Sequence, residues 1–145
     1  MDQEADMMID SLGTPFSAGG LSLSLRDAGR FGQTLLQNGR WQGEQVIPAV
    51  AVASISSGGD PAKFSGAGFK TLPGGSYRSQ WWALHNENGA YSARGIHGQA
   101  IYIDPAAEMV IARFATFPIS FNAAIDPTSL PAYQAVADYL VSKTN

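Results

Sequence analysis

The segment Gly95-Ile96-His97-Gly98-Gln99 holds the residues whose types and spacing best suit chemistry. It interrupts a run of β-forming residues, 90–104, which we predict to be one strand. Glycine inside a strand costs stability and usually marks a place where a ligand or another backbone comes close. We therefore predict that a ligand or a catalytic loop approaches the backbone here. The alternative is that the glycines form a bulge that bends the strand.

The two histidines offer imidazole groups for proton transfer, but the sequence around them does not favour that role. Spacing implies no Asp or Ser partner for His97, and a histidine inside a strand is typically a structural hydrogen-bond donor. His85 stands beside a predicted turn at residues 86–89 and is expected to be exposed. A zinc site needs three or four converging ligands, so two histidines without cysteine predict no metal centre, and no cofactor is expected.

Composition limits the classes of function. The chain has 145 residues and a net charge of -3, and its nine lysines and arginines are scattered, so we expect no nucleic-acid partner. The sequence has no run of 18 apolar residues and its acidic start lacks the features of a signal peptide, so we expect no membrane span. Without an export signal, the cytoplasm is the default location. Zero cysteines exclude disulfides and thiolate metal sites.

Local patterns predict helices on both sides of an antiparallel meander. Ser24 is the expected N-cap of a helix over residues 25–37, with Asp27 near the positive end of the helix dipole. We read Asp27 with Arg26 and Arg30 as a solvated helix face. The other predicted elements are a helix at 48–55, a Gly/Ser-rich loop at 56–68, strands at 77–84, 90–104 and 109–115, and a helix at 131–142.

These elements define an α+β class, with a three-stranded antiparallel sheet and packed helices. We predict one partial domain over residues 1–145. It would comprise a helical region at 1–57, antiparallel strands at 77–115 and a C-terminal helix at 130–143.

Several short motifs follow one another in a fixed order. They are Ala18-Gly19-Gly20-Leu21 with Leu25-Arg26-Asp27 and Arg30-Phe31-Gly32, Asn38-Gly39-Arg40-Trp41 with Val46-Ile47-Pro48, and then residues 77–82 and 95–105. In this combination the sequence resembles the serine hydrolases of the β-lactamase and penicillin-binding superfamily, in particular the 6-aminohexanoate-dimer hydrolases and related esterases. The resemblance covers residues 18 to 114 and implies a partial β-lactamase/transpeptidase-like fold.

The nucleophile motif and the third motif of that superfamily are absent from this chain. The resemblance leads us to look for a nucleophilic serine in S-x-x-K, a second motif Y-x-N or S-x-N, and a third motif K-T-G on an edge strand. No serine here has a lysine three residues on, and neither Tyr-x-Asn nor Lys-Thr-Gly occurs. The third motif would fall on Ala93-Arg94-Gly95, where Ala93 replaces the lysine. The resemblance therefore implies the C-terminal part of such an enzyme, inactive when alone.

The resemblance also implies roles for residues of the middle strand. One oxyanion donor in these enzymes is the N–H of the nucleophile, and the other comes from this strand, which places it on Ile96. Gly95, on one side of it, would leave room for substrate. Arg94 and His97 are expected to contact substrate.

Two apolar features complete the predicted cleft. Trp81 and Trp82 must point to opposite faces of their strand, and the resemblance favours Trp82 as the cleft residue. Residues 117–121 form an apolar loop that either borders the acyl pocket or is a hydrophobic plug under the C-terminal helix.

Two hypotheses of function follow. In the first, the chain is the C-terminal portion of a serine hydrolase that cleaves small-molecule amides or esters through an acyl-enzyme, and it supplies the oxyanion and cleft strand without the nucleophile. In the second, it is a non-catalytic binding or assembly module that docks on an N-terminal partner chain. The resemblance implies that a strand from outside this chain pairs with residues 109–115, so this edge of the sheet would be open here. These residues are apolar with one charge, and we therefore expect a homodimer or an N-terminal partner chain.

Overall fold

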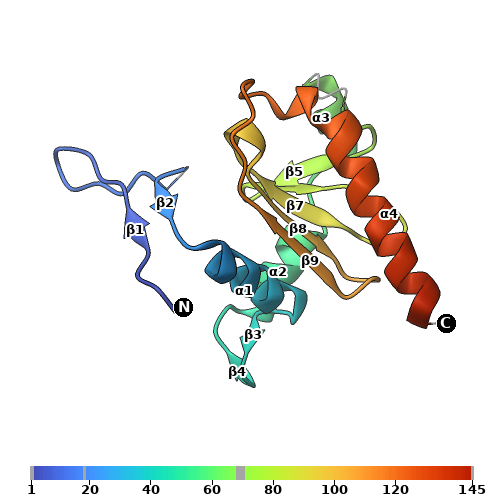
Figure 1. The fold of residues 1–145 in the computed structure, drawn as a ribbon, viewed down its shortest axis with the longest axis horizontal. Helices are drawn as coiled ribbons and strands as arrows, with labels where there is room; N and C mark the ends of the chain where they lie inside the picture. The colour runs from blue at the N-terminus through green and yellow to red at the C-terminus, as the bar shows by residue number, and fades with distance from the viewer. Residues whose placement is uncertain (1, 18, 68–70, 145) are drawn as a thin grey trace.

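The computed structural model describes residues 2–17, 19–67 and 71–144, and one antiparallel sheet lies at its centre (Figure 1). The five strands follow in sequence order: β5 (Ser76–Arg78), β6 (Trp81–Ala83), β7 (Tyr91–Arg94), β8 (Ala100–Asp104) and β9 (Met109–Arg113). Helices cover both faces, so the predicted α+β class is confirmed. None of the described helices is long and apolar enough to cross a membrane.

The prediction of three strands was wrong, because two of the expected strands are hairpins. Ser79 and Gln80 have φ angles of 49° and 68°, and this two-residue turn reverses the chain between β5 and β6. His97 and Gly98, with φ angles of 56° and 89°, lie in the turn between β7 and β8. Neither Ser-Gln nor His-Gly is one of the Asn-Gly or Asp-Gly pairs that signal such turns, so the sequence pattern favoured continuous strands.

One face of the sheet packs against α1 (Leu25–Leu36) and α2 (Ala49–Ser56), which confirms two predicted helices. Ser24 caps α1 as predicted, because its Oγ accepts a hydrogen bond from the Asp27 N–H at 3.1 Å. Gly32 lets α1 come close to β9, since a Cβ there would overlap the Val110 side chain. The buried side chains of this layer are Leu35, Val52, Trp81, Tyr91 and Ile103.

The other face packs against α4 (Asp126–Thr144), which runs along the sheet in Figure 1. The buried side chains of this second layer are Ala90, Tyr102, Met109, Tyr133 and Ala137. The predicted helix began at residue 131, but α4 begins at Asp126. Proline favours the first turn of a helix, which is why the sequence indicated a start at Pro131. In the structure Pro131 lies inside the helix.

A short helix, α3 (Pro61–Gly66), occupies residues that the sequence predicted to be part of a loop at 56–68. That prediction was wrong for this stretch because the loop contains its own helix start signal. Asp60 Oδ1 accepts a hydrogen bond from the Ala62 N–H at 2.9 Å, and Pro61 stands at the first helical position. The last residue of the predicted loop, Gly68, lies outside the described residues.

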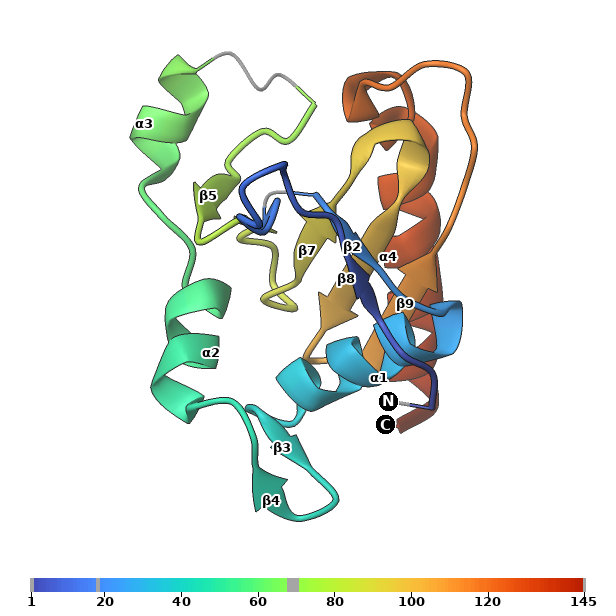
Figure 2. The same ribbon diagram turned by 90° about the vertical axis from the view of Figure 1, so that its left-hand side faces the viewer.

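The described residues before α1 and its cap, 2–17 and 19–23, form an N-terminal arm that leads from α1 away from the sheet (Figure 1). Within it β1 (Asp6–Met7) pairs with β2 (Leu21–Ser22). Figure 2 shows the arm in front of β7 and β8, so the arm lies on the α1 side of the sheet. Ala18, in the first motif of the sequence, lies outside the described residues. A second small hairpin, β3 (Arg40–Trp41) and β4 (Glu44–Gln45), joins α1 to α2.

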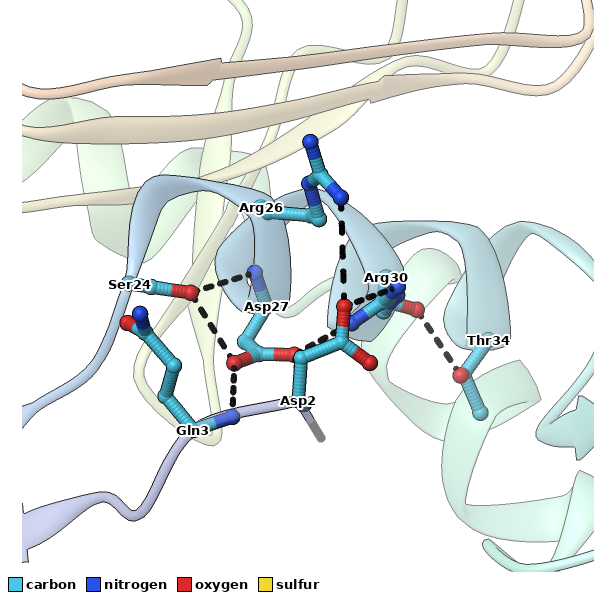
Figure 3. Close-up of polar contacts among 7 residues, drawn as sticks. All are labelled: Asp2, Gln3, Ser24, Arg26, Asp27, Arg30 and Thr34. Atoms are coloured by element: carbon cyan, nitrogen blue, oxygen red, sulfur yellow. Dashed lines mark hydrogen bonds and ion pairs between the residues drawn. The ribbon is translucent and has the colours of Figure 1, made fainter.

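Asp27 ties the start of the arm to α1 (Figure 3). Its carboxylate accepts hydrogen bonds from the Asp2 N–H at 3.0 Å, the Gln3 N–H at 3.3 Å, the Ser24 hydroxyl at 2.9 Å and Arg30 Nη1 at 3.0 Å. These donors, led by the Asp2 N–H, hold the pKa of Asp27 well below its usual range. Asp27 is only 1% exposed, so the prediction of a solvated face was wrong for this residue.

Candidate functional site

The residues singled out in the sequence form the turn between β7 and β8. Gly95 N–H donates to the Gln99 carbonyl at 2.9 Å, and Gln99 N–H donates to the Ile96 carbonyl at 3.3 Å. Ile96 is 65% exposed. Within the described part of the chain, the Ile96 N–H donates no hydrogen bond. The turn therefore presents a backbone donor that no described residue uses.

His97 joins this turn to the segment that follows β9. Its N–H donates to the Ser120 carbonyl at 3.3 Å, and its carbonyl accepts from the Phe117 N–H at 3.1 Å. Its Nδ1 lies 2.7 Å from the Phe117 carbonyl oxygen. A carbonyl can only accept, so Nδ1 carries the proton of this hydrogen bond. His97 thus has the structural donor role that the sequence favoured, although it lies in a turn and not in a strand.

Gln99 and the two glycines fix the shape of the turn. The Gln99 side-chain amide donates to the Ala115 carbonyl at 2.6 Å, and its oxygen accepts from the Ala115 N–H at 3.2 Å. A Cβ on Gly98, whose φ is +89°, would overlap the Phe117 ring, and a Cβ on Gly95 would come within 2.8 Å of the Gln99 Cβ. The chain's own side chains therefore fill the space that the glycines leave.

Arg113 is a functional candidate that the sequence did not reveal. Its Nε donates to the Gly98 carbonyl at 2.7 Å, and its Nη1 donates to Ser129 Oγ at 2.7 Å. Its guanidinium also stacks 5.6 Å from the centre of the Phe117 ring. Arg113 thereby connects the turn to the first turns of α4. The only signal in the sequence is a single charge in an apolar strand.

Arg94, an expected substrate contact, is largely committed to the fold. Its Nη2 bonds both carboxylate oxygens of Asp126, and the Thr71 hydroxyl donates to the same carboxylate at 2.6 Å. The guanidinium lies 5.6 Å from the centre of the Trp82 ring. Arg94 and Asp126 side chains are 9% and 7% exposed. A substrate role for Arg94 stays a prediction, and its observed contacts anchor the end of β7.

An open hollow of about 590 Å³ borders the turn on the side of the arm. Its lining comes from three parts of the chain: the arm and α1 start, the sheet, and the segment after β9. The principal residues are Leu21, Tyr77, Trp82, Gly95, Gln99 and Phe114. Apolar and aromatic groups dominate, with the backbone of the turn at one side, so the hollow suits an uncharged or weakly polar organic ligand.

The two adjacent tryptophans point to opposite faces of β6. Trp81 is 7% exposed and packs in the core, 5.5 Å from the Tyr91 ring. Trp82 is half-buried, stacks edge-on with Tyr77 at 4.6 Å and lines the hollow. Its place fits the predicted cleft residue, and contact with substrate stays a prediction.

The apolar loop at residues 117–121 lies beside the turn. Phe117 packs on Gly98, and Phe121 is exposed. Phe117, Pro118 and Ile119 line a second cavity of about 270 Å³ together with Ile125, which precedes α4, and Ser129, in its first turns. The loop thus packs on the turn and shares a cavity with the first turns of the C-terminal helix, and its role as pocket border or as plug stays a prediction.

A serine and a histidine meet elsewhere, at the other end of the sheet. Ser76 Oγ lies 2.7 Å from His85 Nε2 and accepts a hydrogen bond from the Gly59 N–H at 2.9 Å. His85 is exposed, as predicted, but Ser76 is fully buried. A buried hydroxyl cannot reach a substrate, so this pair is structural. The described residues contain no group of three or more potential metal ligands.

Comparisons with known proteins place this geometry in context. No family model matches the chain. It is 36% identical over 118 residues to a 6-aminohexanoate-dimer hydrolase from Paenarthrobacter ureafaciens, a match that covers 81% of this chain and 30% of that protein. A solved structure from Bacillus anthracis, provisionally assigned as a 6-aminohexanoate-dimer hydrolase, superposes with a TM-score of 0.80 at 32% identity and covers 97% of this chain and 35% of that one. The chain spans about a third of the length of these relatives.

Proposed function

Because the chain belongs to the hydrolase family of the 6-aminohexanoate-dimer hydrolases, we propose that it is the C-terminal portion of a serine hydrolase that cleaves amide or ester bonds. The complete enzyme would act through an acyl-enzyme intermediate on a small-molecule substrate. This chain would supply the second oxyanion donor and one wall of the acyl pocket. The serine nucleophile and its lysine would come from a portion that this sequence does not contain.

The observation that carries this proposal is the unused N–H of Ile96. Acyl transfer builds negative charge on the carbonyl oxygen, and catalysis requires fixed donors about 3 Å from it. The turn that holds Ile96 is bound on one side by Gln99 and His97 and on the other by Arg113. Such a donor needs no reorganisation when the charge develops.

The hollow beside the turn supports a flexible, weakly polar acyl chain as the substrate group. Trp82 and Tyr77 offer aromatic surface, and Gly95 and Gln99 of the turn border the same hollow. We propose that Trp82 contacts the substrate directly. Arg94 and His97 would hold the turn and line its surroundings.

The substitution Ile96→Pro tests the donor without disturbing the turn. Ile96 begins a short 3-10 turn, a conformation whose usual φ of about −50° to −70° is close to that of proline, and the ψ of Gly95 is 167°, in the extended range allowed before proline. Its N–H has no partner within the described residues, so the variant should keep its stability. In an enzyme reassembled with an S-x-x-K portion from a relative, kcat should fall by about 100-fold to 1,000-fold.

Two controls make this test decisive. Ile96→Val retains the N–H and should keep kcat within a few fold. The chain alone should hydrolyse neither p-nitrophenyl butyrate nor a linear amide dimer, because no serine is activated. Equal losses in both Ile96 variants would assign the effect to the side chain and defeat the proposal. So would turnover by the chain alone.

A second candidate function is a non-catalytic assembly module that docks on an N-terminal partner chain. The exposed apolar residues of the arm favour it, among them Met8, Leu12 and Phe16. In that case a mixture with the S-x-x-K portion would form a stable complex without any esterase activity.

A further inference from the structure

A small cavity lies on the α4 side of the sheet, behind the β7–β8 turn. Its volume is about 20 Å³, enough for one water molecule or one monatomic ion. It is lined mainly by polar side chains from β7, β9 and the first turns of α4. These are Ser92, Arg94, Arg113, Asp126, Ser129 and Tyr133.

Two buried hydroxyl groups in this lining have no hydrogen-bond partner. Ser92 is 2% exposed and Tyr133 is 9% exposed, and neither hydroxyl oxygen meets an acceptor or donor within the described residues. Buried hydroxyls are almost always paired, so an occupant of the cavity is the simplest partner for both. Burial raises the pKa of Tyr133, which keeps this hydroxyl protonated and able to donate.

The charges around the cavity sum to one positive charge. Arg94 and Asp126 neutralise each other, and Thr71 also donates to the Asp126 carboxylate. Arg113 bonds only neutral oxygens, those of Gly98 and Ser129, and no carboxylate of the described chain lies within ion-pair distance. A half-buried guanidinium without a counter-charge favours an anion over a neutral guest.

We propose that this cavity binds one small monovalent anion of about the size of chloride. The Ser92 and Tyr133 hydroxyls would donate hydrogen bonds to it, and Arg113 would supply the balancing charge. The Asp126 carboxylate does not oppose this, because Arg94 and Thr71 occupy its oxygens. A bound anion would join β7 to α4 directly behind the turn that carries Ile96. This site is independent of the proposed hydrolase activity.

Two measurements on the purified chain test the proposal. Crystals grown in sodium bromide should show an anomalous peak between Ser92 and Tyr133. In solution, sodium chloride should raise the unfolding temperature above that in sodium gluconate at equal ionic strength. The shift should be on the order of 5 °C and should saturate, as expected when a ligand binds only the folded state.

Substitutions identify the site. Tyr133→Phe and Ser92→Ala should each remove most of the chloride-specific shift, measured against the same variant in gluconate. Tyr102→Phe is the matched control, because the buried Tyr102 hydroxyl also has no partner among the described residues but does not line the cavity. It should keep the full shift. If one cavity variant does not fold, the other still gives the comparison.

Three results would overturn the proposal. The first is a water molecule at the site with no bromide signal. The second is a bromide peak without any chloride-specific shift, which would mean binding at crystal concentration only. The third is an unchanged shift in Tyr133→Phe or Ser92→Ala.

Discussion

The β7–β8 turn and the N-terminal arm are both hairpin structures, but they differ in how firmly the rest of the chain holds them. The turn is held by backbone bonds from residues 117 and 120 and by the side chains of Gln99 and Arg113. The arm has its own pairing between β1 and β2, and the Asp27 carboxylate of α1 accepts hydrogen bonds from the Asp2 and Gln3 N–H groups at its start. Contacts within the chain therefore fix the position of the candidate donor, Ile96, whereas they leave the arm largely exposed.

The apolar residues of the arm show the same contrast. Its most exposed large side chains are those of Met8, Ile9, Leu12, Phe16 and Leu21. The Bacillus anthracis structure covers 97% of the 145 residues, which leaves about four unmatched, so most of the arm has a counterpart in that longer chain. We infer that the arm docks on another chain, whereas the turn is held in place by contacts within this chain. The predictions below test this difference.

The largest expected effect concerns assembly. The exposed arm and the outer edge of β9, which is unpaired within the described residues, should make the chain associate at micromolar concentration. Sedimentation should give about twice the mass of 15.3 kDa, or a complex with an N-terminal partner chain. Leu12→Asp with Phe16→Asp should weaken association about 10-fold or more.

The matched control for assembly is Val50→Asp. Val50 is equally apolar and exposed but lies on α2, away from the arm, so this variant should associate like the parent. A monodisperse 15.3 kDa species that unfolds cooperatively would contradict the docking role of the arm.

Two glycines with similar φ angles, one in the turn and one in the arm, allow a direct comparison of the two regions. Gly98 has φ +89° and a Cβ there would overlap the Phe117 ring, whereas Gly13, in the arm, has φ +82° and open space around it. Gly98→Ala should lower the free energy of unfolding by about 2–4 kcal/mol, from the left-handed conformation and overpacking together. Gly13→Ala should lower it by only about 1 kcal/mol. Equal losses in urea unfolding would show that Phe117 yields and that the turn is not tightly held.

Two arginines provide a second comparison between the turn and the arm. Arg113→Met removes two hydrogen bonds that hold the turn and should cost about 1.5–3 kcal/mol. Arg26→Met removes an exposed pair with Asp2 at 4.0 Å and should cost less than about 0.5 kcal/mol. Arg113→Lys keeps the charge but not both bonds, so its loss should lie between the two. Urea unfolding of the three variants measures this order.

The sequence predicted elements whose signals are local and missed those set by distant contacts. The helix α1 was predicted because Ser24 and the apolar spacing of its face are read within a few residues. The turn at Ser79 and Gln80 was missed because neither residue type favours a positive φ. The pairing of Tyr77 with Trp82 and of Arg78 with Trp81 imposes that conformation.

In the candidate site, too, the sequence predicted what local signals indicate and missed what distant contacts determine. The position of Ile96 was indicated by its glycine neighbours and by the family resemblance, and its role as a donor is not tested by the structure. Arg113 was missed because its contact with Gly98 joins residues 15 positions apart. Asp27 was misjudged for a similar reason, since its backbone donors lie 24 and 25 positions away.

The smallest expected effect is on the pH dependence of the link between arm and body. The folded-state pKa of Asp27 is lowered, chiefly by the Asp2 N–H and also by Arg30 and Ser24. Its contribution to stability is therefore fully present above the unfolded pKa of about 4 and is lost as pH falls below that value. In Asp27→Asn this titration is absent, so the stability difference from the parent should shrink between pH 7 and pH 3. Asp10→Asn is the control: Asp10 also has a lowered pKa, but its donors, the Thr14 and Leu12 N–H groups, belong to the arm itself.

Proteolysis of the arm should accelerate at acid pH in the parent and should already be fast at pH 7 in Asp27→Asn. An acid-resistant protease is used at the low pH. An arm that is cleaved at the same rate in the parent and in Asp27→Asn at pH 7 would show that this carboxylate does not hold it.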